Sequence, residues 1–161
     1  MKILLTAINS KFIHSNLAVR YLKAFTEDMD YISKIREFSI NDRDEKVLEE
    51  IIKEKPDIVA FSTYIWNIEM VKRLSNLIKI VNSDIKILYG GPEVSYDSSN
   101  ILNELNGDYL IEGEGEKTYR EFVEYTLGER DIKSIRGLYY KEGNKVIGNG
   151  NRPLMNMNEI V

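Results

Sequence analysis

Short apolar runs alternate along the chain with longer segments in which apolar residues recur every three or four positions. The strand-like runs span residues 2–8, 57–62, 84–89 and 108–111, and a mixed run spans 31–40. The helical stripes span residues 17–25, 47–52, 70–81, 101–105 and 119–127. A strand–helix unit repeated five times predicts a doubly wound α/β fold with a parallel sheet and right-handed crossovers.

The first strand–helix loop helps to choose the strand order of this sheet. Residues 9–14 lack the glycine pattern of a dinucleotide-binding loop. We therefore expect five parallel strands in the flavodoxin-like order 2-1-3-4-5, a Rossmann-like arrangement. Asn67 is expected to cap the third helix.

The C-terminal segment has a different pattern. Residues 135–140 and 145–147 flank a Glu142-Gly143-Asn144 turn and predict a β-hairpin. Residues 154–161 show no clear periodicity. We expect an α/β domain at 1–130, followed at 131–161 by the hairpin and a linker to a further domain.

Composition narrows the class of protein. Of the 161 residues, 43% are apolar and 30% charged, as in ordinary globular domains. The net charge of −4 argues against a general nucleic-acid binder, and no apolar run approaches the ~20 residues of a membrane span. The absence of cysteine excludes disulfides and cysteine-held iron–sulfur clusters within this sequence. A cytoplasmic location is the default expectation.

Glycines follow two of the predicted strands directly. Gly90-Gly91-Pro92-Glu93 follows the fourth strand, and Gly113-Glu114-Gly115-Glu116 follows the fifth. Glycine lets a ligand approach the backbone closely, and ligands of open α/β sheets bind at the carboxyl ends of the strands. The two motifs predict a large, flat ligand at this edge, and a valine at Gly91 is expected to block it without harming the fold. The alternating acids Glu112, Glu114 and Glu116 suit a helix start better than catalysis.

Other phosphate-binding motifs fail on inspection. Residues 113–118 resemble a phosphate loop faintly, but Glu116 stands where a glycine should precede Lys117. A receiver domain needs acidic residues where this chain has Asn9 and Thr63.

Two single residues near the same edge have alternative interpretations. His14, the only histidine, is either a loop residue at the helix entry or a ligand contact. Trp66 is either part of the core or a flat platform for a ring system.

Four segments together resemble a known family. They are Lys-Phe-Ile-His-Ser-Asn-Leu-Ala at 11–18, Ser62-Thr63, Gly-Gly-Pro-Glu at 90–93, and Asp-Tyr-Leu-Ile-Glu-Gly-Glu-Gly-Glu-Lys-Thr-Tyr at 108–119. Over about residues 1–130 the chain resembles the N-terminal cobalamin-binding domain of radical S-adenosylmethionine enzymes. The magnesium-protoporphyrin IX monomethyl ester cyclase-like group belongs to these enzymes.

The resemblance implies that cobalamin lies at the carboxyl ends of the strands. Ser62 and Thr63 would hydrogen-bond its nucleotide tail or amides, Gly90 and Gly91 would let the backbone pass beside the tail, and Gly113 and Gly115 would line the far wall. Phe12, Ile13 and Trp66 would face the corrin, as their loop positions suggest. The full set of expected cofactor contacts is Ser10, Phe12, Ile13, His14, Ser62, Thr63, Trp66, Gly90, Gly91, Pro92, Glu93, Gly113, Glu114 and Gly115. No catalytic residue or metal ligand is expected.

The sequence departs from the related Asp-x-His-x-x-Gly motif, in which histidine binds cobalt. Phe12 and Leu17 replace its Asp and Gly around His14, so cobalt coordination by His14 is not expected. The Cys-x-x-x-Cys-x-x-Cys motif of radical chemistry is also missing. The resemblance therefore places S-adenosylmethionine and a [4Fe-4S] cluster in a C-terminal radical domain of the same protein, a methyltransferase or cyclase. This chain alone is then not catalytic. A ligand-free docking module and a flavin-binding flavodoxin-like protein remain the alternatives.

Overall fold

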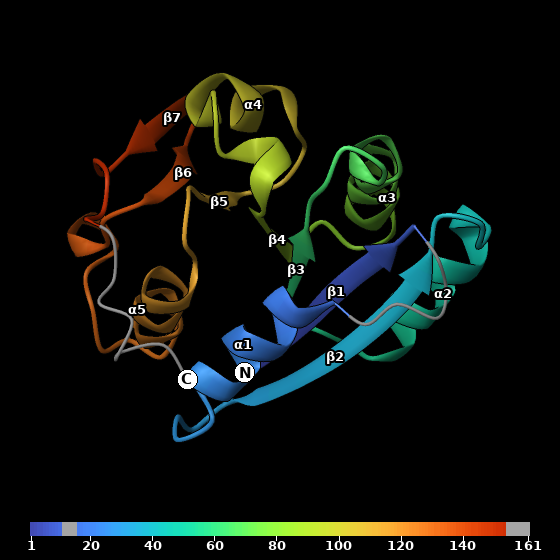
Figure 1. Ribbon diagram of the computed structural model, residues 1–161, viewed down its shortest axis with the longest axis horizontal. Coiled ribbons are helices and arrows are strands. Elements are labelled where there is room, and N and C mark those ends of the chain that lie inside the picture. The colour runs from blue at the N-terminus through green and yellow to red at the C-terminus, as the bar shows by residue number, and fades with distance from the viewer. Residues whose placement is uncertain (11–15, 154–161) are drawn as a thin grey trace.

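The computed structural model describes residues 1–10 and 16–153, which form one seven-stranded sheet with helices on both faces (Figure 1). The strands are β1 (Lys2–Asn9), β2 (Ile32–Ser39), β3 (Ile58–Ser62), β4 (Lys86–Gly90), β5 (Tyr109–Ile111), β6 (Leu138–Glu142) and β7 (Lys145–Gly148). The helices are α1 (Leu17–Phe25), α2 (Asp44–Lys53), α3 (Ile68–Val81), α4 (Ser98–Glu104) and α5 (Glu116–Thr126). Two 3₁₀ turns, η1 (Pro92–Val94) and η2 (Ile132–Ser134), complete the elements.

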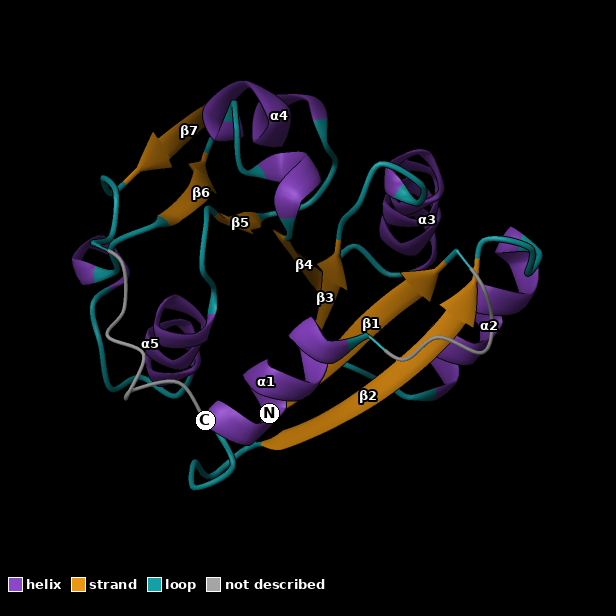
Figure 2. Ribbon diagram, in the orientation of Figure 1, coloured by secondary structure: helices purple, strands orange, loops and turns teal. Residues whose placement is uncertain are grey.

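The strands lie in the order β2-β1-β3-β4-β5-β6-β7. The predicted five-stranded sheet is wrong, because the order 2-1-3-4-5 describes only the parallel part. The predicted hairpin, β6 and β7, joins this sheet as two antiparallel strands, as the opposed arrowheads in Figure 2 show. It pairs with β5, with Leu110 opposite Tyr139, and so covers the backbone edge that β5 would otherwise expose. A domain division at residue 130 stays a prediction.

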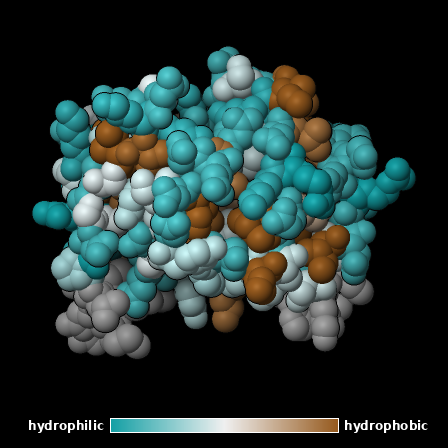
Figure 3. Space-filling view, turned by 90° about the horizontal axis from the view of Figure 1, so that it is seen from above, coloured by the Kyte–Doolittle hydropathy of each residue, from teal (hydrophilic) through white to brown (hydrophobic). Residues whose placement is uncertain are grey.

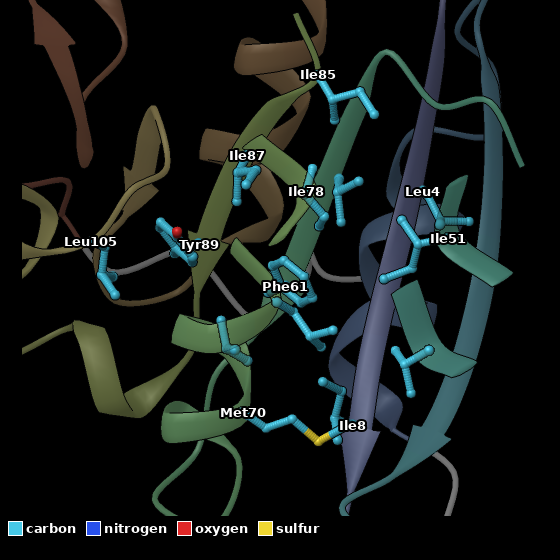
Figure 4. Packing of buried hydrophobic residues seen from close by; sticks show 14 of the residues in the cluster. Leu4, Ile8, Ile51, Phe61, Met70, Ile78, Ile85, Ile87, Tyr89 and Leu105 are labelled. Atoms are coloured by element: carbon cyan, nitrogen blue, oxygen red, sulfur yellow. The ribbon is translucent and has the colours of Figure 1, made fainter. Parts of the chain in front are cut away.

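Residues alternate strictly between the two faces of the sheet, and this alternation creates two cores. On β3, Ile58 and Ala60 face α1 and α5, while Val59 and Phe61 face α2 and α3. Figure 4 shows the second core, where Phe61 and Tyr89 lie among aliphatic side chains and the Met70 sulfur lies beside Ile8. Both faces are therefore buried, which explains the nearly continuous apolar sequence of the central strands.

At the end of the sheet where the parallel strands begin, one carboxylate forms ion pairs with three basic side chains. Glu54 follows α2 and pairs with Lys2, Lys34 and Arg36 at 3.2, 2.8 and 3.1 Å, respectively. Hydrogen bonds from Lys34, Arg36 and Lys2 outweigh its desolvation and lower the pKa of Glu54 to about 2. The charged form thus ties α2 to β1 and β2.

One face of the molecule is mostly hydrophilic (Figure 3). Figure 3 views the molecule from the top of Figure 1, the side toward which β1 and β3 point, and shows separate hydrophobic patches among polar residues. No helix within the described part of the chain is long and apolar enough to cross a membrane.

Candidate functional site

A cavity of about 230 Å³ lies between the sheet and the two helices α1 and α5. Its floor is the face of the sheet that packs against α1 and α5. Four neighbouring parallel strands contribute to this floor through Leu5, Ala60, Leu88 and Ile111. One wall is α1, and the other is the loop that leads into α5. The complete lining is Leu5, Ala18, Val19, Leu22, Ala60, Phe61, Ser62, Tyr64, Leu88, Tyr89, Gly90, Gly91, Pro92, Ile111, Gly113, Glu114, Gly115 and Glu116.

The cavity exists because small residues stand where large side chains would fill the core. A Cβ atom on Gly90 would meet no atom within 4 Å. A Cβ atom on Gly115 would lie 3.7 Å from Ile111 and from Leu22, an ordinary contact. Ala60 adds a short side chain to the floor. The backbone at this edge therefore leaves an apolar slot that a flat group could enter.

Gly91 has a different role from that of its neighbour. Its backbone is left-handed, with φ at +107°, and a Cβ atom there would lie 2.3 Å from the Thr63 carbonyl oxygen. The missing side chain thus lets the loop after β4 pack against the backbone that follows β3. The expectation that valine at Gly91 would leave the fold intact is wrong, because the substitution is both strained and obstructed.

Thr63 joins the ends of β3 and β4. It is fully buried, and its backbone N–H and its Oγ1 both donate to the Gly90 carbonyl, at 2.7 and 2.6 Å. Its hydroxyl is therefore engaged within the protein. Ser62, one residue earlier, lines the cavity, and a direct contact of either residue with a ligand stays a prediction.

Asn67 and Trp66 fix the ends of β1 and β3 relative to each other. Asn67 precedes α3 as expected, but its side chain does not cap the helix. Its Nδ2 instead donates to the carbonyls of Ile8 and Ser62, both at 3.0 Å. Trp66 donates its Nε1–H to the same Ile8 carbonyl at 3.2 Å and stacks on Tyr64 with centroids 4.5 Å apart. Tyr64 lines the cavity, so this network holds part of its rim.

The loop before α5 forms the far wall of the cavity, and two hydrogen bonds hold this loop in place. The Gly113 N–H donates to the Ser95 hydroxyl at 3.1 Å, and Ser98 donates to the Glu112 carboxylate at 2.6 Å. Glu112 is thereby turned away from the cavity, which is lined instead by Glu114 and Glu116.

The predicted site residues fall into three groups. The first group lines the cavity between the sheet, α1 and α5, and its members are Ser62, Gly90, Gly91, Pro92, Gly113, Glu114 and Gly115. Those outside its lining are Ser10, Thr63, Trp66 and Glu93. Phe12, Ile13 and His14 lie outside the described residues, so their predicted contacts are not tested.

Sequence reasoning missed the apolar floor and the α1 wall. Leu5, Val19, Leu22, Leu88 and Ile111 read as ordinary core positions in the sequence. A usable signal was Ala60, a short apolar side chain between the bulky Val59 and Phe61 of β3. The described residues contain no group of three or more His, Cys, Asp or Glu side chains that could hold a metal ion.

Comparison with known proteins assigns the chain to a family. The B12 binding domain family matches residues 3–123. The chain belongs to the B12-binding domain family.

Curated relatives of this B12-binding domain include methyltransferases. The chain is 33% identical over 112 residues to an uncharacterized methyltransferase of Pyrococcus horikoshii, covering 68% of this chain and 24% of that protein. It is 27% identical over 95 residues to the cobalamin-dependent radical SAM methyltransferase TokK of Streptomyces tokunonensis, covering 58% and 14%, respectively. The domain thus spans a quarter or less of the length of these relatives.

Solved structures of two radical enzymes have a similar fold. The radical S-adenosylmethionine methyltransferase TsrM of Kitasatospora setae, solved with cobalamin and a [4Fe-4S] cluster, superposes with a TM-score of 0.77 at 18% identity, covering 98% of this chain and 30% of that one. The cobalamin-dependent S-adenosylmethionine radical enzyme OxsB, with aqua-cobalamin bound, gives 0.78 at 17% identity, covering 99% and 23%. The cyclase-like subgroup stays a prediction.

The B12-binding domain offers a cavity whose chemistry suits part of the cobalamin molecule. Cobalamin combines a flat corrin with a nucleotide tail that ends in an apolar base. Leu5, Ala60 and Leu88 present an apolar surface for such a base, and the space above Gly90 is open. Ser62 adds a hydroxyl at the level where the strands end. The residues present therefore fit this cofactor.

Proposed function

We propose that the nucleotide tail of cobalamin enters the slot between the sheet and α1 and α5. The corrin then rests on the carboxyl ends of the strands. The observation that carries the proposal is the open space above Gly90, in a cavity that is lined mainly by apolar residues. Bound cobalamin supplies a cobalt centre that can carry a methyl group.

The residues of this chain bind and orient the cofactor. The apolar floor excludes water from the tail and stabilises it by burial, at ~25 cal/mol per Å² of apolar surface. The Asn67 and Thr63 hydrogen bonds keep the strand ends fixed, so that the slot is formed before the cofactor arrives.

Titration with hydroxocobalamin tests the proposal, with the visible spectrum and retention after gel filtration as readouts. Ala18→Phe adds a ring at the mouth of the slot, where Ala18 lines the cavity. Ala24→Phe is its matched control, because Ala24 is exposed on the same helix and does not line the cavity. We expect roughly tenfold weaker binding, about 1.4 kcal/mol, for Ala18→Phe alone.

The outcomes separate the alternatives. Equal binding by both variants would place cobalamin elsewhere. Failure of the unmodified protein to retain cobalamin at high micromolar concentration would favour a ligand-free docking module on the same fold. A yellow protein that keeps flavin would favour the flavodoxin-like alternative.

We further propose that the parent protein joins this domain to a C-terminal radical SAM domain. That domain would supply S-adenosylmethionine binding and the [4Fe-4S] cluster, since this chain has no cysteine. The names of TokK, TsrM and OxsB support a radical enzyme, and the first two support methyl transfer. Ring formation, as in the cyclase-like group, is the alternative reaction of the parent protein. The gene sequence after Val161 tests this: a Cys-x-x-x-Cys-x-x-Cys motif supports it, and a stop codon refutes it.

A further inference from the structure

The slot has acidic but no basic side chains in its described lining. Among the described lining residues, Glu114 and Glu116 are the only acidic ones, and none is Lys, Arg or His. Both carboxylates come from the wall that leads into α5, one on each side of Gly115. The mouth of the slot is therefore acidic on this side.

Neither carboxylate is neutralised within the described part of the chain. The side chains of Glu114 and Glu116 form no hydrogen bond or ion pair with a described residue, although the chain forms many ion pairs elsewhere. Glu112, the third acid of the run, differs because it accepts the Ser98 hydroxyl. Glu114 is exposed and Glu116 half-buried, so both remain available as acceptors at the edge of the cavity.

Free carboxylates discriminate between ligands of different charge. They accept hydrogen bonds from primary amides and hydroxyls, and they repel other carboxylates at short range. The corrin of cobalamin carries a ring of primary amides, whereas incompletely amidated corrinoids carry carboxylates at the same positions.

We propose that Glu114 and Glu116 select fully amidated corrinoids over corrinoid acids. This proposal rests on the proposed cobalamin site and describes which corrinoids that site prefers. The two residues act as acceptors for corrin amides, and a carboxylate brought to the same place meets two uncompensated like charges.

Binding of cobalamin and of its b-, d- and e-monocarboxylic acids, each with one amide hydrolysed, tests the selection. We expect at least one acid to bind about fivefold to tenfold more weakly than cobalamin at low salt. The preference should shrink when salt is raised to ~1 M, where the screening length is about 3 Å. In Glu114→Gln/Glu116→Gln, amides replace the carboxylates, and the acid should bind within about twofold of cobalamin.

Glu104→Gln is the matched control, since Glu104 is an exposed acid at the end of α4 that does not line the slot. It removes the same kind of charge and should keep the discrimination. Far-UV circular dichroism verifies that all variants are folded.

The two proposals fail in different ways. If the unmodified protein binds no cobalamin, the proposed function fails. If it binds cobalamin and all three acids equally, or if the double variant keeps the full discrimination, the selection by Glu114 and Glu116 is refuted while the cobalamin site stands.

Discussion

Valine substitutions at Gly90 and Gly91 should separate binding from folding, although the two glycines are adjacent. The space above Gly90 is open toward the slot, whereas that above Gly91 is occupied by the Thr63 backbone. Gly90→Val should therefore weaken cobalamin binding and leave the stability of the fold nearly unchanged. The main effect of Gly91→Val should be a loss of folding stability.

The expected loss at Gly91 follows from its surroundings. A β-branched residue in a left-handed conformation costs on the order of 1–3 kcal/mol. Displacing Thr63 also weakens its two hydrogen bonds to the Gly90 carbonyl, at 2.7 and 2.6 Å, each worth roughly 0.5–1.5 kcal/mol. The sum is roughly 2–6 kcal/mol, a large part of the ~5–15 kcal/mol typical of a domain. At about 2–4 °C per kcal/mol, Tm should fall by roughly 4–24 °C.

The expected loss at Gly90 concerns the ligand. Valine in place of glycine suits a strand, so Tm should change by less than about 4 °C, the equivalent of ~1 kcal/mol. If the side chain excludes on the order of 100 Å² of apolar contact with the tail, binding loses about 2.5 kcal/mol, roughly 70-fold in Kd.

Thermal and urea unfolding measure the first effect, and hydroxocobalamin titration measures the second. A Gly91→Val protein with the Tm of the unmodified protein would refute the close-packing argument. A Gly90→Val protein that binds cobalamin normally would refute the placement of the tail.

Two further predictions concern stability. The pKa of Glu54 is lowered to about 2 in the folded protein, so its charged form stabilises the fold above its ordinary pKa of 4.5 and loses this effect as pH falls toward 2. Urea unfolding should show Glu54→Gln less stable by about 1–2 kcal/mol at pH 7, with the difference vanishing near pH 2, and a pH-independent difference would contradict this. Tyr89→Phe removes the buried hydrogen bond from Tyr89 to Ser75 at 2.7 Å but leaves Ser75 bonded to Val71. It should lower stability by about 1 kcal/mol, or ~2–4 °C in Tm, and an unchanged Tm would show that this bond contributes nothing.

Local sequence determined the strands and helices of the parallel part of the sheet. Each parallel strand is a short apolar run and each helix an amphipathic stripe, and both patterns depend on residues only a few positions apart. The glycines at 90–91 and 113–115 were visible in the sequence near strand ends, and the structure places a cavity beside them.

Tertiary structure decided the extent of the sheet and the role of each glycine. The hairpin at 138–148 was visible locally, but its pairing with β5 depends on an edge formed by a distant part of the chain. Likewise, Asn67 reads as a helix cap, yet its side chain bonds Ile8, a partner 59 positions away. Gly90 and Gly91 are indistinguishable in sequence, and only the packing of Thr63 against one of them separates an open slot from a structural contact. The sequence determines what each segment prefers, while the space that remains between segments depends on which side chains the fold brings together.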